Sequence, residues 1–504
     1  MSSPVFRQPR RRHLPALALA AALGGCAVGP DYHTPAAPTD ARLTEAPLLG
    51  QTVSAATPGG TAQRLTVGRD IPGEWWTLFH SPQVTALVRQ ALAGNPTVTA
   101  AQATLREALQ NVRAGQGALF PQLSASVQAQ RQQASLAAFG LGSGTATFGL
   151  ITGAVNVSYT LDAFGGIRRQ IEQLNAQAEY QRYEVEATIL TLAANVITTA
   201  INEASLQAQI DITNDIVRAD NEALRLMQQR FQLGGVSQVE VLQQQSLLDA
   251  KVATLPDLRK QLQQTRNQLA VLLGGRPAGY TMPTLKLNDL TLPADLPVSL
   301  PSKLVEQRPD IRAYAALLHA AYTGVGIATA NMLPQITLTG SLGREGTDLP
   351  NVFTPSGLVW SIASSLAQPI FEGGTLLARR RAAQAALEVA AAQYSDTVNV
   401  AFQNVADALV AIQRDAEALH AALAAEKTAA ASLAMTLSQY EAGAGSYLAV
   451  LTAEQVEYSA RLTLQMAQAA RFTDTVALFQ ALGGGWWNRD DIDPKTAHCC
   501  GVLP

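Results

Sequence analysis

The sequence has few charged side chains, few aromatic ones and almost no cysteine. Charged residues make up 15% of the 504 residues and apolar residues 47%, a balance that excludes a disordered chain. The formal net charge of −3 gives no reason to expect a nucleic-acid partner. Three cysteines cannot supply a disulfide scaffold. The body of the chain also lacks an unbroken apolar run of about eighteen residues, so no membrane-spanning helix is expected there.

The N-terminus has the three parts of a bacterial export signal. A basic stretch, RQPRRRH, precedes the apolar core LPALALAAAL and then the small residues of LGGC. This order resembles a lipobox, so we expect residues 1–25 to be a lipoprotein signal peptide and Cys26 to be the lipid-modified residue of an anchored segment, 26–82. Ala27 at the next position is compatible with delivery to the outer membrane. The alternative is an ordinary signal peptide with a chance cysteine.

The rest of the chain shows the same order of signals twice, about 210 positions apart. The matching positions are Pro121 and Pro334, Gly165 and Gly373, Phe231 and Tyr440, and Leu273 and Leu482. A shared offset across four pairs indicates an internal two-fold sequence repeat. The boundaries that we expect are a first repeat at 83–276, a proline-rich, non-helical connector at 277–301, a second repeat at 302–487 and a C-terminal tail at 488–504.

The long helices have a heptad pattern. From about Gly166 to Leu233 apolar residues recur at seven-residue spacing, which predicts a helix on the order of 100 Å long that packs as in a coiled coil. Its other faces are rich in Ala, Gln and Thr, a composition that suits packing on two sides in a curved wall. Pro256 lacks an amide hydrogen and is expected to interrupt the return helix of the first repeat.

Four short stretches alternate between apolar and polar residues. They lie at about 123–130, 155–162, 336–342 and 358–366. Such alternation over about ten residues is typical of an outer-membrane barrel strand, and a strand of a soluble sheet is the alternative. A Gly/Ala/Ser-rich loop is expected at 134–152. Asp162 ends one strand and has two interpretations, a lumen-lining carboxylate or an N-terminal cap of the following helix.

The number of strands predicts the assembly. In hydrocarbon only a closed barrel leaves no backbone group unpaired, and four strands are too few to close. We therefore expect an α+β membrane protein that forms a trimeric 12-strand β-barrel, with four strands per chain. Four long helices from each chain would continue it as a 12-helix α-barrel.

Motifs for catalysis or cofactor binding are missing. The sequence contains no GxSxG, HExxH or GxxxxGK[ST], and its six histidines have no ligand spacing. His498, Cys499 and Cys500 near the C-terminus form an incomplete set of metal ligands. We predict a passive conduit that is not an enzyme and that needs no cofactor.

Several longer motifs together resemble one family. They are the LGGC-AVGPDY start, EWWTLFHSPQVTALVRQALAGNPTV, ALFPQL, DAFGG, LLGGRP, NMLPQI, QPIFEGG and YEAGAGSYLAVL. From Cys26 to about Trp487 the chain resembles outer-membrane efflux lipoproteins of the TolC/OprM type. The resemblance implies a homotrimer in the lipid of the Gram-negative outer membrane that extends into the periplasm. It also implies a periplasmic adaptor, a proton-driven inner-membrane pump, and export of drugs or other small toxic solutes.

Two alternatives stay open at this point. One is the outer-membrane duct of a type I protein secretion system. The other is an adhesive coiled-coil lipoprotein without a pore, although such a protein would have no use for alternating strands. The LGGC lipobox and the GPDY start favour efflux of small molecules.

In this family the two helix-turn-helix tips form the periplasmic entrance, where adaptor hairpins bind. Carried over to this chain, the tips are 230–237 and 440–448. Glycines are expected there because a tight reversal needs backbone conformations that other residues resist. The implied adaptor-docking residues are Arg230, Gly234, Gly235, Ser237, Gly443, Gly445 and Ser446.

The resemblance also implies residues that close the entrance. Tyr440 matches a family aromatic that holds it closed. Relatives often carry acidic residues where this chain has Gly445 and Thr452. Glu441 and Glu454 are the nearest substitutes for these gate residues, and a solvated surface role is the alternative for each.

Overall fold

The computed structural model describes residues 27–36, 44, 49–135, 137, 140, 142–278, 285–299 and 301–489. The leader, Cys26 and the tail residues His498, Cys499 and Cys500 lie outside the described residues. The chain divides into two compact units, each built from segments that are far apart in the sequence. Residues 105–180 and 314–394 supply the body of the first unit, and most of the remaining described residues form the second.

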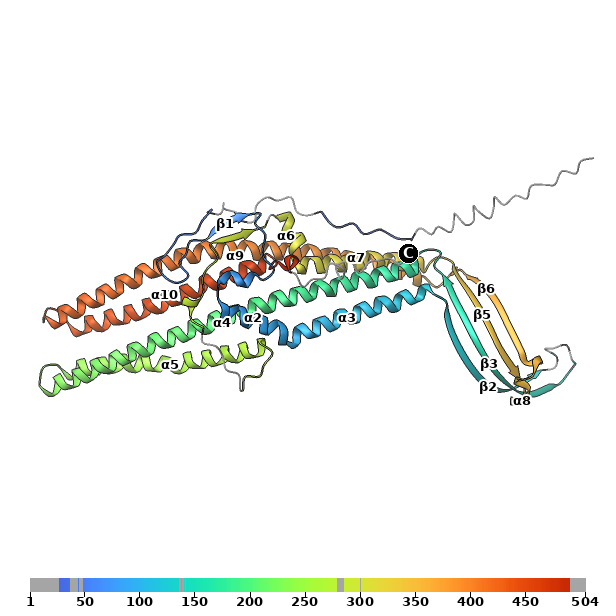
Figure 1. Cartoon of the computed structure of the whole chain (residues 1–504), viewed down its shortest axis with the longest axis horizontal. Coiled ribbons are helices and arrows are strands. Elements are labelled where there is room, and N and C mark those ends of the chain that lie inside the picture. Colours follow the sequence, from blue (N-terminus) through green and yellow to red (C-terminus); the bar gives the residue numbers. More distant parts are fainter. Residues whose placement is uncertain are drawn as a thin grey trace, which may run out of the picture. The chain divides into compact units, whose positions relative to one another are not determined.

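A four-stranded antiparallel sheet dominates the first unit (Figure 1). In spatial order its strands are β2 (Gln122–Ser135), β3 (Thr145–Leu161), β5 (Gln335–Gly346) and β6 (Leu358–Ala367). The first hairpin extends into the stretch predicted as a loop at 134–152, so that prediction is too long. Residues 145–152 pair with β2 through backbone groups, a pairing that needs no bulky side chain.

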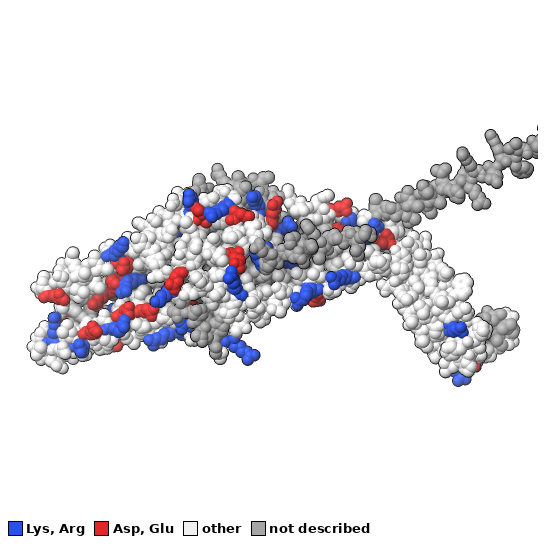
Figure 2. Space-filling model, viewed as in Figure 1, with Lys and Arg blue, Asp and Glu red and all other residues white. Residues whose placement is uncertain are grey.

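The register places the apolar positions of all four strands on one face and the polar positions on the other. One apolar row across the sheet is Ala125, Val155, Leu342 and Trp360. The neighbouring polar row is Ser124, Asn156, Ser341 and Ser361. Figure 2 shows the strands almost free of charged side chains except near the hairpin loops. The alternation read from the sequence is therefore confirmed, as lipid on one side and water on the other require.

The two outer strands of the sheet have free edges. Among the described residues β2 pairs only with β3 and β6 only with β5. Nearly every residue of both outer strands is exposed. Because the four strands alternate in direction, the β6 of one copy would run antiparallel to the β2 of another. The free edges therefore match each other.

Two long helical hairpins run into and through the second unit. One is α4 (Gly166–Gln232) with α5 (Gln238–Leu272), and the other is α9 (Thr375–Glu441) with α10 (Tyr447–Ala481) (Figure 1). The helices α4 and α9 both have 67 residues, and α5 and α10 both have 35. Equal lengths in the two halves agree with the internal repeat inferred from the offsets.

Pro256 does not interrupt the return helix, so that expectation is wrong. It lies inside α5, which continues to Leu272. A proline inside a helix costs about 3 kcal/mol because a hydrogen bond is lost and the ring crowds the preceding turn. Leu255 and Leu262 on either side are buried in a cluster with Ile210 of α4. Lateral packing along the heptad offsets the local cost.

Two features of the second unit were not expected from the sequence. The first repeat begins with two helices, α2 (Pro82–Gly94) and α3 (Pro96–Gln116), which are separated at Asn95. Proline disfavours a helical conformation in the residue before it. The Asn95 side-chain amide donates to the Leu272 carbonyl over 2.8 Å. In the connector, β4 (Asp295–Val298) pairs in parallel with β1 (Arg64–Val67).

One window of α4 is long and apolar enough to cross a membrane by length and composition alone. However, 56% of that window is buried within the chain. Val196, Ile197 and Ile201 are each fully buried. A helix in the packed core of a protein passes the same test. We assign the apolar side chains of α4 to helix packing.

An aromatic cluster forms the centre of the second unit. Trp75 and Phe79 belong to one 3-10 turn, η1 (Trp75–Phe79), and Phe479 comes from α10. The Phe479 ring stacks on Trp75 with 5.3 Å between centroids and meets Phe79 edge-on. All three side chains are at most 1% exposed. This cluster joins the N-terminal segment to the last helix.

We predict that Phe479→Ala lowers the free energy of unfolding by about 3–5 kcal/mol, because truncation leaves a cavity in a closed aromatic cluster. Thermal unfolding of the purified protein checks this as a lower Tm. Val67→Ala is the control, since Val67 is also apolar but 65% exposed. Equal losses in the two variants would contradict the assignment of the cluster to the core.

Candidate functional site

The two hairpin tips have the same backbone geometry. Gly234 and Gly443 have φ values of +76° and +73°, a region that favours glycine. The next amide in each tip, of Gly235 or Ala444, donates over 2.8 Å to a carbonyl five positions back. This is the closing bond of a Schellman-type helix end.

The structure corrects one expectation about the tip glycines. Only Gly234 and Gly443 have positive φ, whereas Gly235 and Gly445 do not. The counterpart of Gly235 is Ala444, as the matching hydrogen bonds show. The left-handed conformation is therefore needed at one position in each tip. The backbone conformation of the reversal does not require glycine at position 235 or 445.

A serine begins the return helix after each tip. The Ser237 side chain accepts from the Glu240 amide, and the Glu240 carboxylate accepts in return from the Ser237 amide over 2.7 Å. Ser446 likewise accepts from the amide of Ala449, which has no carboxylate to complete the box. The first tip is therefore the more completely capped of the two.

An apolar cluster joins the two tips. Met227 of the first hairpin is buried with Tyr447 and Leu451 of the second. Tyr440 packs against this cluster, with its ring centroid 5.1 Å from that of Tyr447 and its hydroxyl 3.9 Å from the Met227 sulfur. The Tyr447 hydroxyl donates to Gln244 over 2.6 Å. Tyr440 is therefore a contact between hairpins and not an isolated surface residue.

Deeper along the hairpins lies a buried ion pair that the sequence analysis missed. Lys251 Nζ is 2.9 Å from Asp220 Oδ2, and the two side chains are only 2% and 4% exposed. Lys251 also lies over the ring of Tyr458, 5.7 Å from its centroid. The sequence does indicate that Lys251 is buried, because it lies between Leu248 and Leu255 on the buried heptad face of α5.

Glu454 is half-buried and feels the charges of this ion pair, unlike the exposed residues of the tip. Burial, and then the negative charge of Asp220, raises the pKa of Glu454 to about 7 despite the opposing charge of Lys251. One of its carboxylate oxygens is buried and has no hydrogen-bond partner among the described residues. Glu441, by contrast, is exposed. The two gate candidates therefore have different environments.

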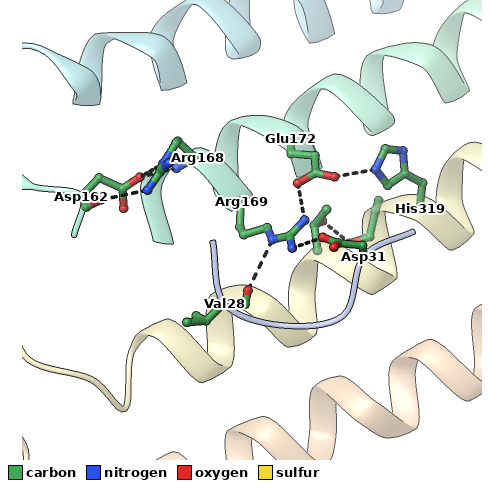
Figure 3. Close-up of polar contacts among 9 residues, drawn as sticks. Val28, Asp31, Asp162, Arg168, Arg169, Glu172 and His319 are labelled. Carbon is green, nitrogen blue, oxygen red and sulfur yellow. Dashed lines mark hydrogen bonds and ion pairs between the residues drawn. The ribbon is translucent and has the colours of Figure 1, made fainter. Parts of the chain in front are cut away.

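Asp162 caps the long helix. Its carboxylate accepts from the backbone amides of Ile167 and Arg168 over 2.9 and 3.0 Å. The Arg168 side chain also pairs with it (Figure 3). Of its two interpretations, the N-terminal cap is the one that the hydrogen bonds support. No group of three or more His, Cys, Asp or Glu among the described residues is arranged to hold a metal ion.

Comparison with known proteins identifies this architecture. The family model described as outer membrane efflux protein matches residues 87–275 and 300–484. The chain belongs to that family. The two matched ranges correspond to the two halves of the internal repeat. Family membership confirms the resemblance on which the carried-over residues depend.

Individual relatives match over nearly their whole length. The toluene efflux pump outer membrane protein TtgC of Pseudomonas putida is 29% identical over 93% of this chain and 94% of its own. The cation efflux system protein CusC of Escherichia coli is 29% identical over 93% and 97%. A solved structure of the outer-membrane channel OprN matches with a TM-score of 0.82 and 26% identity, over 92% of this chain and 100% of that one.

These findings confirm the predicted assembly. The protein is an efflux channel of the outer membrane in which three chains complete a 12-strand β-barrel that continues as a long helical barrel. It works with a periplasmic adaptor and an inner-membrane pump in a tripartite system. We infer that neighbouring copies pair at the free edges of β2 and β6, because a closed barrel leaves no edge unpaired.

We predict that Glu454→Gln stabilises the protein more strongly as the pH rises. A pKa raised to about 7 means that folding disfavours the ionised carboxylate, so the unsubstituted protein loses stability as the pH rises from about 4.5 through 7. The Tm difference between E454Q and the unsubstituted protein should be small at pH 5 and clearly larger at pH 8. Glu441→Gln is the exposed control. A pH-independent difference for E454Q would contradict the buried environment of Glu454.

Proposed function

We propose that this channel is a passive duct for small toxic solutes whose entrance lies at the two hairpin tips. The proposal is supported by the two equivalent hairpin tips. One apolar cluster joins them, and exposed apolar side chains lie beside them. Leu233 is 87% exposed, and Val239 and Leu448 are more than half exposed. Apolar side chains at the end of a helical hairpin suit the binding of a further helical hairpin.

The adaptor docks on the surface that the tips present. Arg230 is exposed beside the first reversal, and Ser237 and Ser446 begin the return helices at the sides of the tips. The capped, glycine-closed reversals give this surface a fixed shape before the adaptor arrives, which lowers the entropic cost of binding. The proposed docking residues are Arg230, Gly234, Gly235, Ser237, Gly443, Gly445 and Ser446.

Tyr440 holds the entrance closed in this proposal. Its ring and hydroxyl join the second hairpin to Met227 of the first, so opening that separates the hairpins must break these contacts. Glu454 acts from inside the hairpins, where its charge is disfavoured beside Asp220. Glu441 is exposed at the end of α9 and is available to a partner.

The exported solutes are small and toxic to the cell. The relatives are named as components of efflux pumps for toluene, for antibiotics and for cations, which supports this class over the secreted proteins of a type I system. The energy comes from the partner pump, which we take to be proton-driven. The duct itself carries out no chemistry.

Cys26 provides the membrane anchor outside the barrel. The lipobox LGGC ends at this residue, and acyl chains contribute about 0.8 kcal/mol for each buried methylene. A multiply acylated cysteine would therefore hold each chain in the outer membrane before its strands are paired.

Two substitutions separate the entrance from the docking surface. Tyr440→Ala should raise the mean conductance of the channel in planar bilayers severalfold and leave capture by the immobilised adaptor unchanged. Leu233→Glu should weaken adaptor capture by about tenfold or more, because burying a leucine contributes about 1.5–3 kcal/mol, and should leave conductance unchanged. A Y440A channel with unaltered conductance would contradict the closing role, and full capture by L233E would contradict docking on the tip.

A further inference from the structure

The first residues of the described chain are attached to the strand-helix junction of the first unit. Residues 27–33, here called the strap, cross the turn between β3 and α4 and lie along α7 (Pro309–Ala330) (Figure 3). The Val28 amide donates to the Phe164 carbonyl over 3.1 Å. The strap is therefore bonded to the fold directly after the predicted lipid-attachment residue.

Arg169 at the start of α4 is the centre of this attachment. Its side chain is only 6% exposed, and it donates to the Val28 carbonyl, to Asp31 and to Glu172 over 3.4, 2.5 and 2.8 Å (Figure 3). Hydrogen bonding to Arg169 also lowers the pKa of the Asp31 carboxyl. A buried guanidinium with three acceptors, two of them on the strap, fixes the strap in one register.

Aromatic stacking closes the other end of the strap. The Tyr32 ring stacks on His319 of α7 with 4.5 Å between centroids and meets Tyr322 edge-on. His319 Nε2 is 2.8 Å from the Glu172 carboxylate, the same group that pairs with Arg169. Polar and aromatic contacts thus form one continuous network around the strap.

The strap fits so closely that its seat has no room for a methyl group. A Cβ on Gly165 would come within 2.6 Å of the Ala27 Cα. A Cβ on Gly326 of α7 would come within 2.9 Å of the Val28 carbonyl oxygen and 3.2 Å of the Arg169 side chain. Real Cβ atoms essentially never approach a backbone atom within 3.0 Å, so glycine at both positions admits the strap.

The second repeat supplies an internal comparison. α9 begins 209 positions after α4, so the aligned helix starts pair Gly165 with Gly374, one position beyond the Gly373 that the sequence offsets suggested. In the same alignment Ala378 and Arg381 stand where α4 has Arg169 and Glu172. A Cβ on Gly374 would meet nothing within 4 Å. The same scaffold therefore exists without a strap in the described residues, and neither an arginine at the position of Arg169 nor the close fit at the junction glycine is repeated there.

From these contacts we propose that the strap is a fixed mount that places the acyl chains of Cys26 at the end of β3, so that lipid attachment delivers the first strand hairpin to the bilayer. The proposal rests on the acylation of Cys26 proposed above. Its partner is the lipid surface of the outer membrane. Arg169 is a positioning residue that acts through the strap.

Tether length explains why a fixed mount matters. With the strap seated, the anchored residue is about 4 Å along the chain from Ala27, which is packed against the junction. A released strap would add seven residues, or about 25 Å of reach. Effective concentration falls as a flexible tether lengthens, so the strands would meet the bilayer less often.

Gly326→Ala tests the mount, and Gly324→Ala is its matched control. Both glycines lie in α7, where alanine is the better helix former, so a loss in G326A cannot come from a weaker helix. A Cβ on Gly324 meets only the Gln173 side chain at an ordinary 3.5 Å. Arg169→Met is a second variant that removes the guanidinium without adding volume to the seat.

The measurement uses the full acylated protein in opened outer-membrane fragments, so that chymotrypsin reaches the periplasmic face. We expect the acylated fragment that ends at Tyr32 to appear at least ten times faster in G326A and R169M than in G324A or the unsubstituted protein. Pulse-labelled G326A and R169M should also form heat-resistant trimers severalfold more slowly, with acylation unchanged by mass spectrometry.

Equal cleavage at Tyr32 in all four proteins would overturn the mount. Faster cleavage with an unchanged rate of trimer formation would overturn the delivery of the hairpin. If the unsubstituted protein carries no acyl chains, the anchor and the mount both fail. Conductance in planar bilayers would then still test the proposal that the protein is a duct.

Discussion

Backbone hydrogen bonding at the free edges of β2 and β6 is the constraint on which the structure depends. Peptide groups in hydrocarbon cannot pair with water, and each unpaired group costs several kcal/mol. The four-stranded sheet leaves two such edges, and its rows of apolar and polar side chains already separate lipid from lumen. When three copies close the barrel, the backbone groups at these edges become paired. The same number of copies then sets the number of helices in the α-barrel.

The internal repeat lets one scaffold take on different tasks in its two halves. Both tips close with one left-handed glycine and begin the return helix with serine, but only the first has the full capping box. The aromatic position before the reversal is Phe231 in the first half and Tyr440 in the second, and Tyr440 contacts the opposite hairpin. Within the described part of the chain, the strap likewise occupies one of two equivalent junctions. Divergence is therefore found at the ends of the long helices, while the lengths of the four hairpin helices are kept.

Periodic features of the fold were predictable from the sequence. The alternation in β2, β3, β5 and β6 fixed which face is apolar, and the heptad spacing predicted α4 to within a residue of its end. Local rules failed where packing decided the outcome. Pro256 is tolerated because leucines on either side are buried, and residues 145–152 form a strand because a partner strand is beside them.

The candidate site was predictable in its positions but not in its contacts. The glycines and serines marked both tips, yet the contact of Tyr440 with Met227 joins residues 213 positions apart and has no local signature. The pairing of Lys251 with Asp220 was missed for a related reason. A lysine on a buried heptad face indicates that an acidic partner exists, but the sequence does not show which residue it is. The attachment of the strap to Arg169 spans 138 positions and needed the fold itself.

Native mass spectrometry of the detergent-solubilised, full-length protein tests the central claim most directly. Sharing of strands between copies predicts a particle that contains three chains and that loses its conductance when it dissociates. A single chain that conducts ions on its own would contradict the requirement that neighbouring copies close the barrel.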